Sequence, residues 1–118
     1  MKGFSEALIG DLRLNAPHVK VSVVMPGHIG TSIALNTMKA QGFGETDADL
    51  PEEMRQMGED FRSRGLSPDQ AAGIILDGVR QESWRILVGP DAIFLDQAVR
   101  AAPEKAYEAD FLPPWATR

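Results

Sequence analysis

Apolar positions along the chain follow helical spacing in some blocks and strand-like spacing in others. Phe4, Leu8 and Leu12 recur every fourth residue, which places them on one face of a predicted helix that ends at the Asn-Ala-Pro of residues 15–17. No Ser, Thr, Asp or Asn precedes this pattern as an N-cap. We therefore expect either a frayed helix end or a helix whose first turns lie before Met1.

A strand is predicted directly after this helix. Residues 19–25 (VKVSVVM) are rich in valine and lie between two prolines. Valines alternate through most of the run, but Val24 and Met25 are both apolar, so neither face of the strand is clearly polar. Apolarity on both faces is typical of parallel sheets that are covered by helices on both sides.

The segment from Gly30 to Gly65 resembles an insertion. Its pattern predicts a short helix over Thr31–Lys39, a loop, and a charged helix over Pro51–Arg64. That second helix carries acids in its first turn and arginines in its last, which suits the helix dipole. Its apolar stripe is thin and consists of Met54, Met57 and Phe61. We expect it to cover other parts lightly.

The C-terminal part repeats the helix and strand pattern. Ser67 to Gln70 forms a capping box with proline at the first helical position, and the helix continues to about Gln81. A second short strand is predicted over Trp84–Val88, and a further helix over residues 90–101. The tail YEADFLPPWATR is expected to pack irregularly.

Strands that alternate with helices predict an α/β unit with a parallel sheet. At 118 residues the chain is at most one domain. Two strands make a marginal sheet, and a strand that is apolar on both faces needs neighbours at both edges. We therefore expect residues 1–118 to be a single partial domain from one end of a larger sheet.

Composition narrows the classes of partner. The hydrophobic share of 43% and charged share of 25% are those of an ordinary globular protein. A net charge of −5 without any basic run argues against nucleic-acid binding. The chain has no cysteine and no apolar stretch near the ~20 residues of a membrane span. We expect a cytoplasmic protein with no membrane partner.

The predicted end of the first strand carries the candidate site. Ligands of open α/β sheets bind beyond the carboxyl ends of the strands, where Pro26 and Gly27 lie. The backbone of Ile29 and the hydroxyl of Thr31, near the start of the next helix, could hold a planar amide or an anion. The alternative is a purely structural Pro-Gly turn, which is the commoner case.

Three segments carry a family resemblance: GFSEALIGDLR, VKVSVVMPGHIGTSI and SPDQAAGIILDGVRQESWRILVGPDA. In order and spacing they resemble the C-terminal half of a classical short-chain dehydrogenase/reductase, from Lys2 to about Ala102. The resemblance implies a partial Rossmann-like, doubly wound parallel sheet, of which the last two strands and their helices are present. It implies hydride transfer between NAD or NADP and a small carbonyl or alcohol substrate.

The same resemblance assigns roles by position. Pro26 and Gly27 would form the turn that faces the nicotinamide, Ile29 would contact its carboxamide through the backbone, and Thr31 would bond the carboxamide or a phosphate. Residues 37–65 would form a mobile lid over the substrate. The first helix and the last helix and strand would lie at subunit contacts, so we expect a homo-oligomer.

The sequence departs from the family where catalysis is concerned. No glycine-rich phosphate turn follows a strand, and the family's catalytic serine has no candidate. The family pairs a tyrosine with a lysine four residues later, but Tyr107 is followed by Phe111, and Lys2 corresponds to a position just after that lysine. We predict that the 118 residues hold no catalytic residue and are inactive alone.

Other chemistry-bearing residues have simpler interpretations. His18 and His28 are expected in exposed loops, although His28 could touch a substrate or a cofactor, and no ligand pattern indicates a metal. Trp84 and Trp115 are expected in packing or at an interface. The open strand edge and the apolar helix faces also support an alternative function, a non-enzymatic module for self-association.

Overall fold

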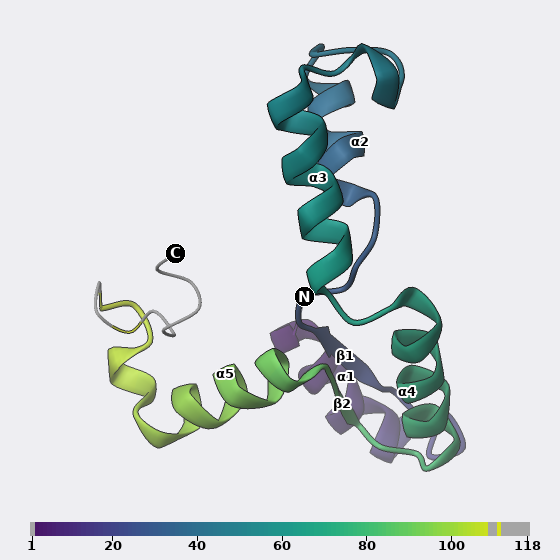
Figure 1. The fold of residues 1–118 in the computed structure, drawn as a ribbon. Coiled ribbons are helices and arrows are strands. Elements are labelled where there is room, and N and C mark those ends of the chain that lie inside the picture. The colour runs from purple at the N-terminus through teal and green to yellow at the C-terminus, as the bar shows by residue number, and fades with distance from the viewer. Residues whose placement is uncertain (1, 109–110, 112–118) are drawn as a thin grey trace.

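The protein is described by a computed structural model, which covers residues 2–108 and 111. Its order is α1 (Lys2–Asn15), β1 (Val23–Pro26), α2 (Ile33–Ala40), η1 (Asp47–Asp49), α3 (Glu52–Arg64), α4 (Pro68–Arg80), β2 (Arg85–Val88), α5 (Pro90–Ala101) and η2 (Pro103–Lys105). Figure 1 labels the α-helices and the two strands. The predicted α/β class and the predicted order of elements are confirmed.

The described sheet has two parallel strands. Val23 of β1 lies opposite Arg85 of β2, and the register continues to Pro26 opposite Val88. The N–H of Val23 donates to Trp84 O at 2.7 Å, and the N–H of Gly27 donates to Val88 O at 2.8 Å. Backbone groups of odd-numbered residues therefore face β2. The nitrogen of Pro26 faces the other edge, so its missing N–H removes no bond to β2.

β1 is shorter than predicted and shifted toward its carboxyl end. The prediction of residues 19–25 was wrong at both ends, because the strand runs from Val23 to Pro26. A strand exists only where a partner supplies hydrogen bonds, and β2 offers four residues for pairing. Within the described part of the chain, the residues before Val23 lie outside any strand.

Helices cover both faces of β2. Ile86 and Val88 are buried and pack with Ala71 of α4. Arg85 points to the opposite face, where its guanidinium contacts the carboxylate of Asp96 on α5 at 2.9 Å. Side chains of adjacent strand residues point to opposite faces. It follows that α4 and α5 lie on opposite sides of β2, as in a doubly wound sheet.

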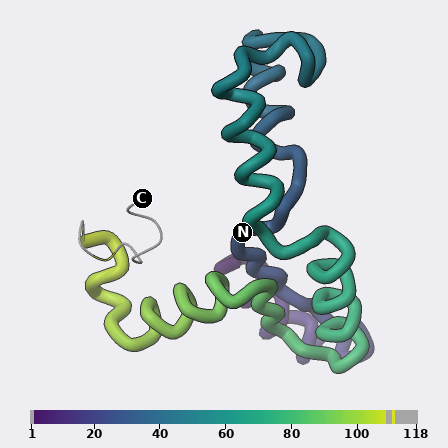
Figure 2. Tube along the Cα trace, in the orientation of Figure 1, coloured from purple at the N-terminus to yellow at the C-terminus, as the bar shows by residue number. Residues whose placement is uncertain are grey.

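The cover over β1 is incomplete. Val24 shares the face of Ile86 through the register, yet 36% of its surface is exposed. The helix α1 contacts β1, but no residue of α1 is fully buried. Its Phe4 and Leu14 are 74% and 85% exposed. The radius of gyration is 17.9 Å, whereas a compact chain of this length would have about 13.5 Å. The described residues therefore form an open structure, in which the segment of α2 and α3 and the far end of α5 extend away from the sheet, as Figure 2 shows.

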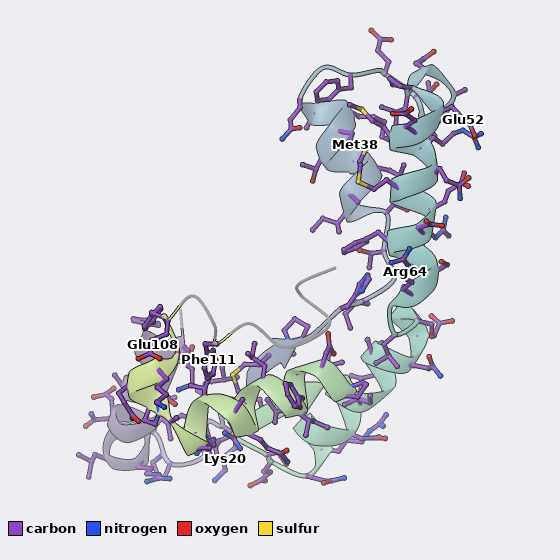
Figure 3. The ribbon with its side chains drawn as sticks, turned by 60° about the vertical axis from the view of Figure 1, so that its left-hand side comes forward. Lys20, Met38, Glu52, Arg64, Glu108 and Phe111 are labelled. Carbon is purple, nitrogen blue, oxygen red and sulfur yellow. The ribbon has the colours of Figure 1, made fainter. Side chains whose placement is uncertain are left out.

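The largest extension is a pair of helices that we call the arm, residues 33–64, comprising α2, η1 and α3 (Figure 1). The helices contact where Leu35 packs against Gly58; a Cβ at Gly58 would lie 2.3 Å from the Leu35 side chain. Figure 3 shows Glu52 at the far end of α3 and Arg64 at its base. The arm is therefore joined to the sheet only near the carboxyl end of β1.

The tip of the arm has its own capping interaction. Thr46 donates from both its N–H and its hydroxyl to the Asp49 carboxylate, each at 2.8 Å. Donation from the Thr46 hydroxyl, helped by its backbone N–H, lowers the pKa of Asp49. The tip therefore carries local order that the predicted plain loop did not include.

Candidate functional site

The candidate site is the turn after β1, residues 26–31, which meets the start of α5. The Asp91 carboxylate lies directly beneath Gly27, where an added Cβ would be 1.9 Å from its Oδ1. The N–H of His28 donates to the other Asp91 oxygen at 2.5 Å. Since Asp91 is in the first turn of α5, the helix dipole also favours its charge. Asp91 thus holds the turn against α5, and a Cβ at position 27 would displace its carboxylate.

The other side of the turn is held by the linker between α3 and α4. The N–H of Leu66 donates to His28 O at 2.9 Å, and the N–H of Gly30 donates to Leu66 O at 2.8 Å. These two bonds form an isolated parallel bridge that pairs Ile29 with Leu66. The turn is therefore held from two directions, by α5 and by the base of the arm.

The base of the arm depends on two glycines in close contact. A Cβ on Gly30 would lie 2.2 Å from the carbonyl oxygen of Arg62, and a Cβ on Gly65 would lie 2.3 Å from the nitrogen of Gly30. The obstructing atoms belong to the backbone, which cannot rotate aside as a side chain does. The chain segments that lead into and out of the arm thus cross at a place that leaves no room for a side chain on either glycine.

Ile29 has a partly buried side chain and a backbone N–H that is free to bind a ligand in the described part of the chain. Its side chain packs against the buried cluster around Val88. Its C=O accepts from the N–H of Thr31 at 2.8 Å, while its own N–H has no acceptor among residues 2–108 and 111. An unpaired N–H at the carboxyl end of a parallel strand is suited to binding a ligand oxygen.

Thr31 and Pro26 lie at the two ends of the turn. Thr31 is half-buried and lines a shallow hollow of about 470 Å³ with residues of α2. Pro26 is exposed. The structure therefore brings Pro26, Gly27, Ile29 and Thr31 onto one short turn, but the Thr31 side chain borders a different hollow from the one beside Gly27.

A larger groove of about 1180 Å³ runs along α3 to the start of α5. We call it the α3 groove. Its lining residues are His28, Glu52, Glu53, Gln56, Met57, Asp60, Phe61, Arg64, Leu66, Pro90 and Asp91. Four carboxylates and one guanidinium line it. Glu52 is paired with Arg55 and Asp60 with Arg64, so the other two carboxylates give the groove a net negative charge that disfavours anions. Met57, which was predicted to pack in the apolar stripe of its helix, is exposed along this groove.

His28 was predicted to be an exposed loop residue, and that prediction was wrong. The residue is half-buried, and its ring centroid lies 4.0 Å from that of Phe61 at a tilt of 39°. Its Nε2 is buried and has no hydrogen-bond partner in the described part of the chain. The position of His28 directly after Pro-Gly placed it in the turn of the candidate site. Its burial could not be predicted, because Phe61, which packs on it, lies far away in the sequence.

The remaining candidates lie away from this turn. Tyr107 is 99% exposed near the C-terminus. Trp84 is partly exposed, with the Arg85 guanidinium 5.7 Å from its ring centroid. Trp115 lies outside the described residues. Over residues 2–108 and 111, no three His, Cys, Asp or Glu side chains are grouped to hold a metal, and no helix is long and apolar enough to span a bilayer.

Comparison with known proteins identifies similar sequences. The chain is 34% identical over 103 residues to "Putative oxidoreductase SadH" from two strains of Mycobacterium tuberculosis, CDC 1551 / Oshkosh and ATCC 25618 / H37Rv. The match covers 85% of this chain and 34% of each relative, so the chain spans about a third of their length. No family model matches it, and no solved structure matches it significantly. The chain is thus a distant relative of part of a protein described as an oxidoreductase.

Proposed function

We propose that this chain is the C-terminal segment of a classical short-chain dehydrogenase/reductase. The complete protein would transfer hydride between NAD or NADP and a carbonyl or alcohol carbon. Similarity to the SadH relatives supports the oxidoreductase class. The doubly wound cover of β2 supports a segment of a Rossmann-like sheet.

The observation that carries the proposal is the unpaired N–H of Ile29 at the carboxyl end of β1. A planar carboxamide needs a donor for its oxygen and an acceptor for its NH₂ group. The N–H and C=O of Ile29 would supply both, and the Thr31 hydroxyl would add a further bond. When bound, the nicotinamide supplies the hydride chemistry, and the protein orients it. Gly27 leaves room for Asp91, which holds the turn in place.

The arm would act as the substrate lid. Its two helices pack on each other. It is attached to the sheet at its base, through the crossing of the glycines at positions 30 and 65, the bridge between Ile29 and Leu66, and the contact of His28 with Phe61. An element with few contacts to the sheet can move without disturbing the core. The arm lies beside the turn that would hold the nicotinamide, which is where a substrate must approach.

The first test is an activity assay of two proteins. The 118-residue chain and the product of the complete reading frame that contains it are each incubated with NADH or NADPH and a panel of ketones and aldehydes. We expect oxidation of the cofactor only by the longer protein. In that protein Thr31→Val should raise the KM for the cofactor about 3- to 10-fold, since one hydrogen bond is lost.

The matched control is Ser83→Ala, which removes a hydroxyl just before β2, at the opposite end of the sheet. It should leave the cofactor KM unchanged. Activity of the 118-residue chain alone, or an equal effect of the two substitutions, would contradict the assigned roles. Inactivity of the longer protein with every substrate and both cofactors would contradict the proposed oxidoreductase function.

A second candidate function is self-association without catalysis. The exposed side chains of Phe4 and Leu14 on α1, and the open edge of β1, favour it. Under this hypothesis, sedimentation of the 118-residue chain at micromolar concentration should show a dimer or larger species. A folded monomer would exclude self-association as its function. A dimer that also requires upstream residues for activity would fit the oligomeric enzyme instead.

A further inference from the structure

The backbone of His28 is held on both sides. Its N–H donates to Asp91 and its C=O accepts from Leu66 at 2.9 Å. Those two bonds fix its Cα at the point where β1 ends and the α3 groove begins. The imidazole is therefore attached to a rigid part of the molecule, as a group that positions a ligand should be.

The imidazole itself is left with an unpaired nitrogen. The Nε2 atom is buried and has no partner among the described residues, while the ring lies against Phe61. A buried polar atom without a hydrogen bond destabilises a protein by about 1–3 kcal/mol. A purely packing role would be filled better by an apolar ring, because such a ring carries no desolvation penalty.

The groove beside His28 suits a ligand with an apolar body and little negative charge. Met57, Phe61, Leu66 and Pro90 contribute apolar surface, and the carboxylates along α3 outnumber the single Arg64. An imidazole nitrogen can donate to a carbonyl oxygen when protonated and accept from a hydroxyl when not. An uncharged carbonyl or alcohol substrate can present either kind of oxygen away from its reacting carbon.

We propose that His28 is a substrate-positioning residue, whose Nε2 binds an oxygen of an uncharged carbonyl or alcohol substrate in the α3 groove. This inference rests on the proposed function. In this structure Nε2 is buried, and the Phe61 ring lies against the imidazole. Because that ring is 37% exposed and belongs to the arm, rotation of its side chain or movement of the arm uncovers Nε2.

The test is His28→Phe in the longer, active protein, with His18→Phe as the matched control. Phenylalanine keeps the ring contact with Phe61 and removes the nitrogen. The KM for an uncharged substrate should rise about 3- to 10-fold with kcat and the cofactor KM nearly unchanged, because the lost bond is made equally in ground and transition states. At the same time Tm should rise, since the unpaired buried nitrogen is gone.

This pair of changes separates positioning from packing. A packing role predicts no change in KM, and a structural hydrogen bond predicts a lower Tm; either result overturns the inference. His28→Gln, whose amide can bind the same oxygen, should recover part of the lost affinity, and failure to recover any counts against it. If the longer protein without any substitution showed no hydride transfer, the proposed function would be overturned, and this inference with it.

Discussion

Gly65→Ala should lower the free energy of unfolding by about 3 kcal/mol. The added Cβ would lie 2.3 Å from the nitrogen of Gly30 and 2.7 Å from the carbonyl carbon of Ile29. Since both atoms belong to the backbone, relief requires the linker to move away from the turn. That movement would break the bonds between Leu66 and its partners in the turn, His28 and Gly30. Denaturation in urea, followed by circular dichroism, measures the effect.

The control for this substitution is Gly73→Ala. Gly73 lies in α4, and an added Cβ there would have no heavy atom within 4 Å. Alanine in a helix interior is more stable than glycine by about 0.5–1 kcal/mol. We therefore expect the two Gly→Ala changes to have opposite signs. Similar small effects at both positions would show that the arm is not held at this crossing.

Gly27→Ala should destabilise the turn by about 2 kcal/mol, because its Cβ would displace the Asp91 carboxylate that bonds His28. The backbone of Gly27 does not require glycine by its φ angle, since the positive-φ glycines of the described residues are Gly42 and Gly89. The cost is thus steric alone. Asp91→Ala should have a similar cost, because it leaves the His28 N–H unpaired.

The two substitutions should not add. In the double variant Gly27→Ala/Asp91→Ala the obstructing carboxylate is absent, so the new Cβ has space. A double-mutant cycle in urea denaturation should therefore give a coupling energy of about 1–2 kcal/mol. Additive effects would mean that Gly27 and Asp91 are not in the contact described. The same variants in the longer protein should raise the cofactor KM in the same order.

Local signals in the sequence predicted the helices well. The capping box at Ser67 is present, with the N–H of Gln70 donating to the Ser67 hydroxyl at 3.2 Å, and α4 begins at Pro68 as expected. Helices form from contacts between near neighbours, so caps and periodicity suffice to place them. The extent of β1 was not predictable in this way, because it depends on the four residues that β2 offers.

The surroundings of the candidate site also depend on distant residues. Neither the contact of Asp91 with Gly27 nor that of Phe61 with His28 has a signal at short range in the sequence. The Gly58 contact with Leu35 could have been suspected from a glycine within a helix. The ligand roles of Pro26, Gly27, Ile29 and Thr31 remain predictions, because the structure gives their geometry and the assays above test their chemistry.

The open edge of β1 sets a limit on how the sheet can be extended. Val24 carries the last strand N–H that faces this edge, because Pro26 has none. The next N–H on that side, of His28, is donated to Asp91. A neighbouring strand can therefore receive hydrogen bonds alongside Val24 but not past Pro26. If another strand pairs at this edge, Pro26 ends the pairing at its own position and leaves the turn accessible to small molecules.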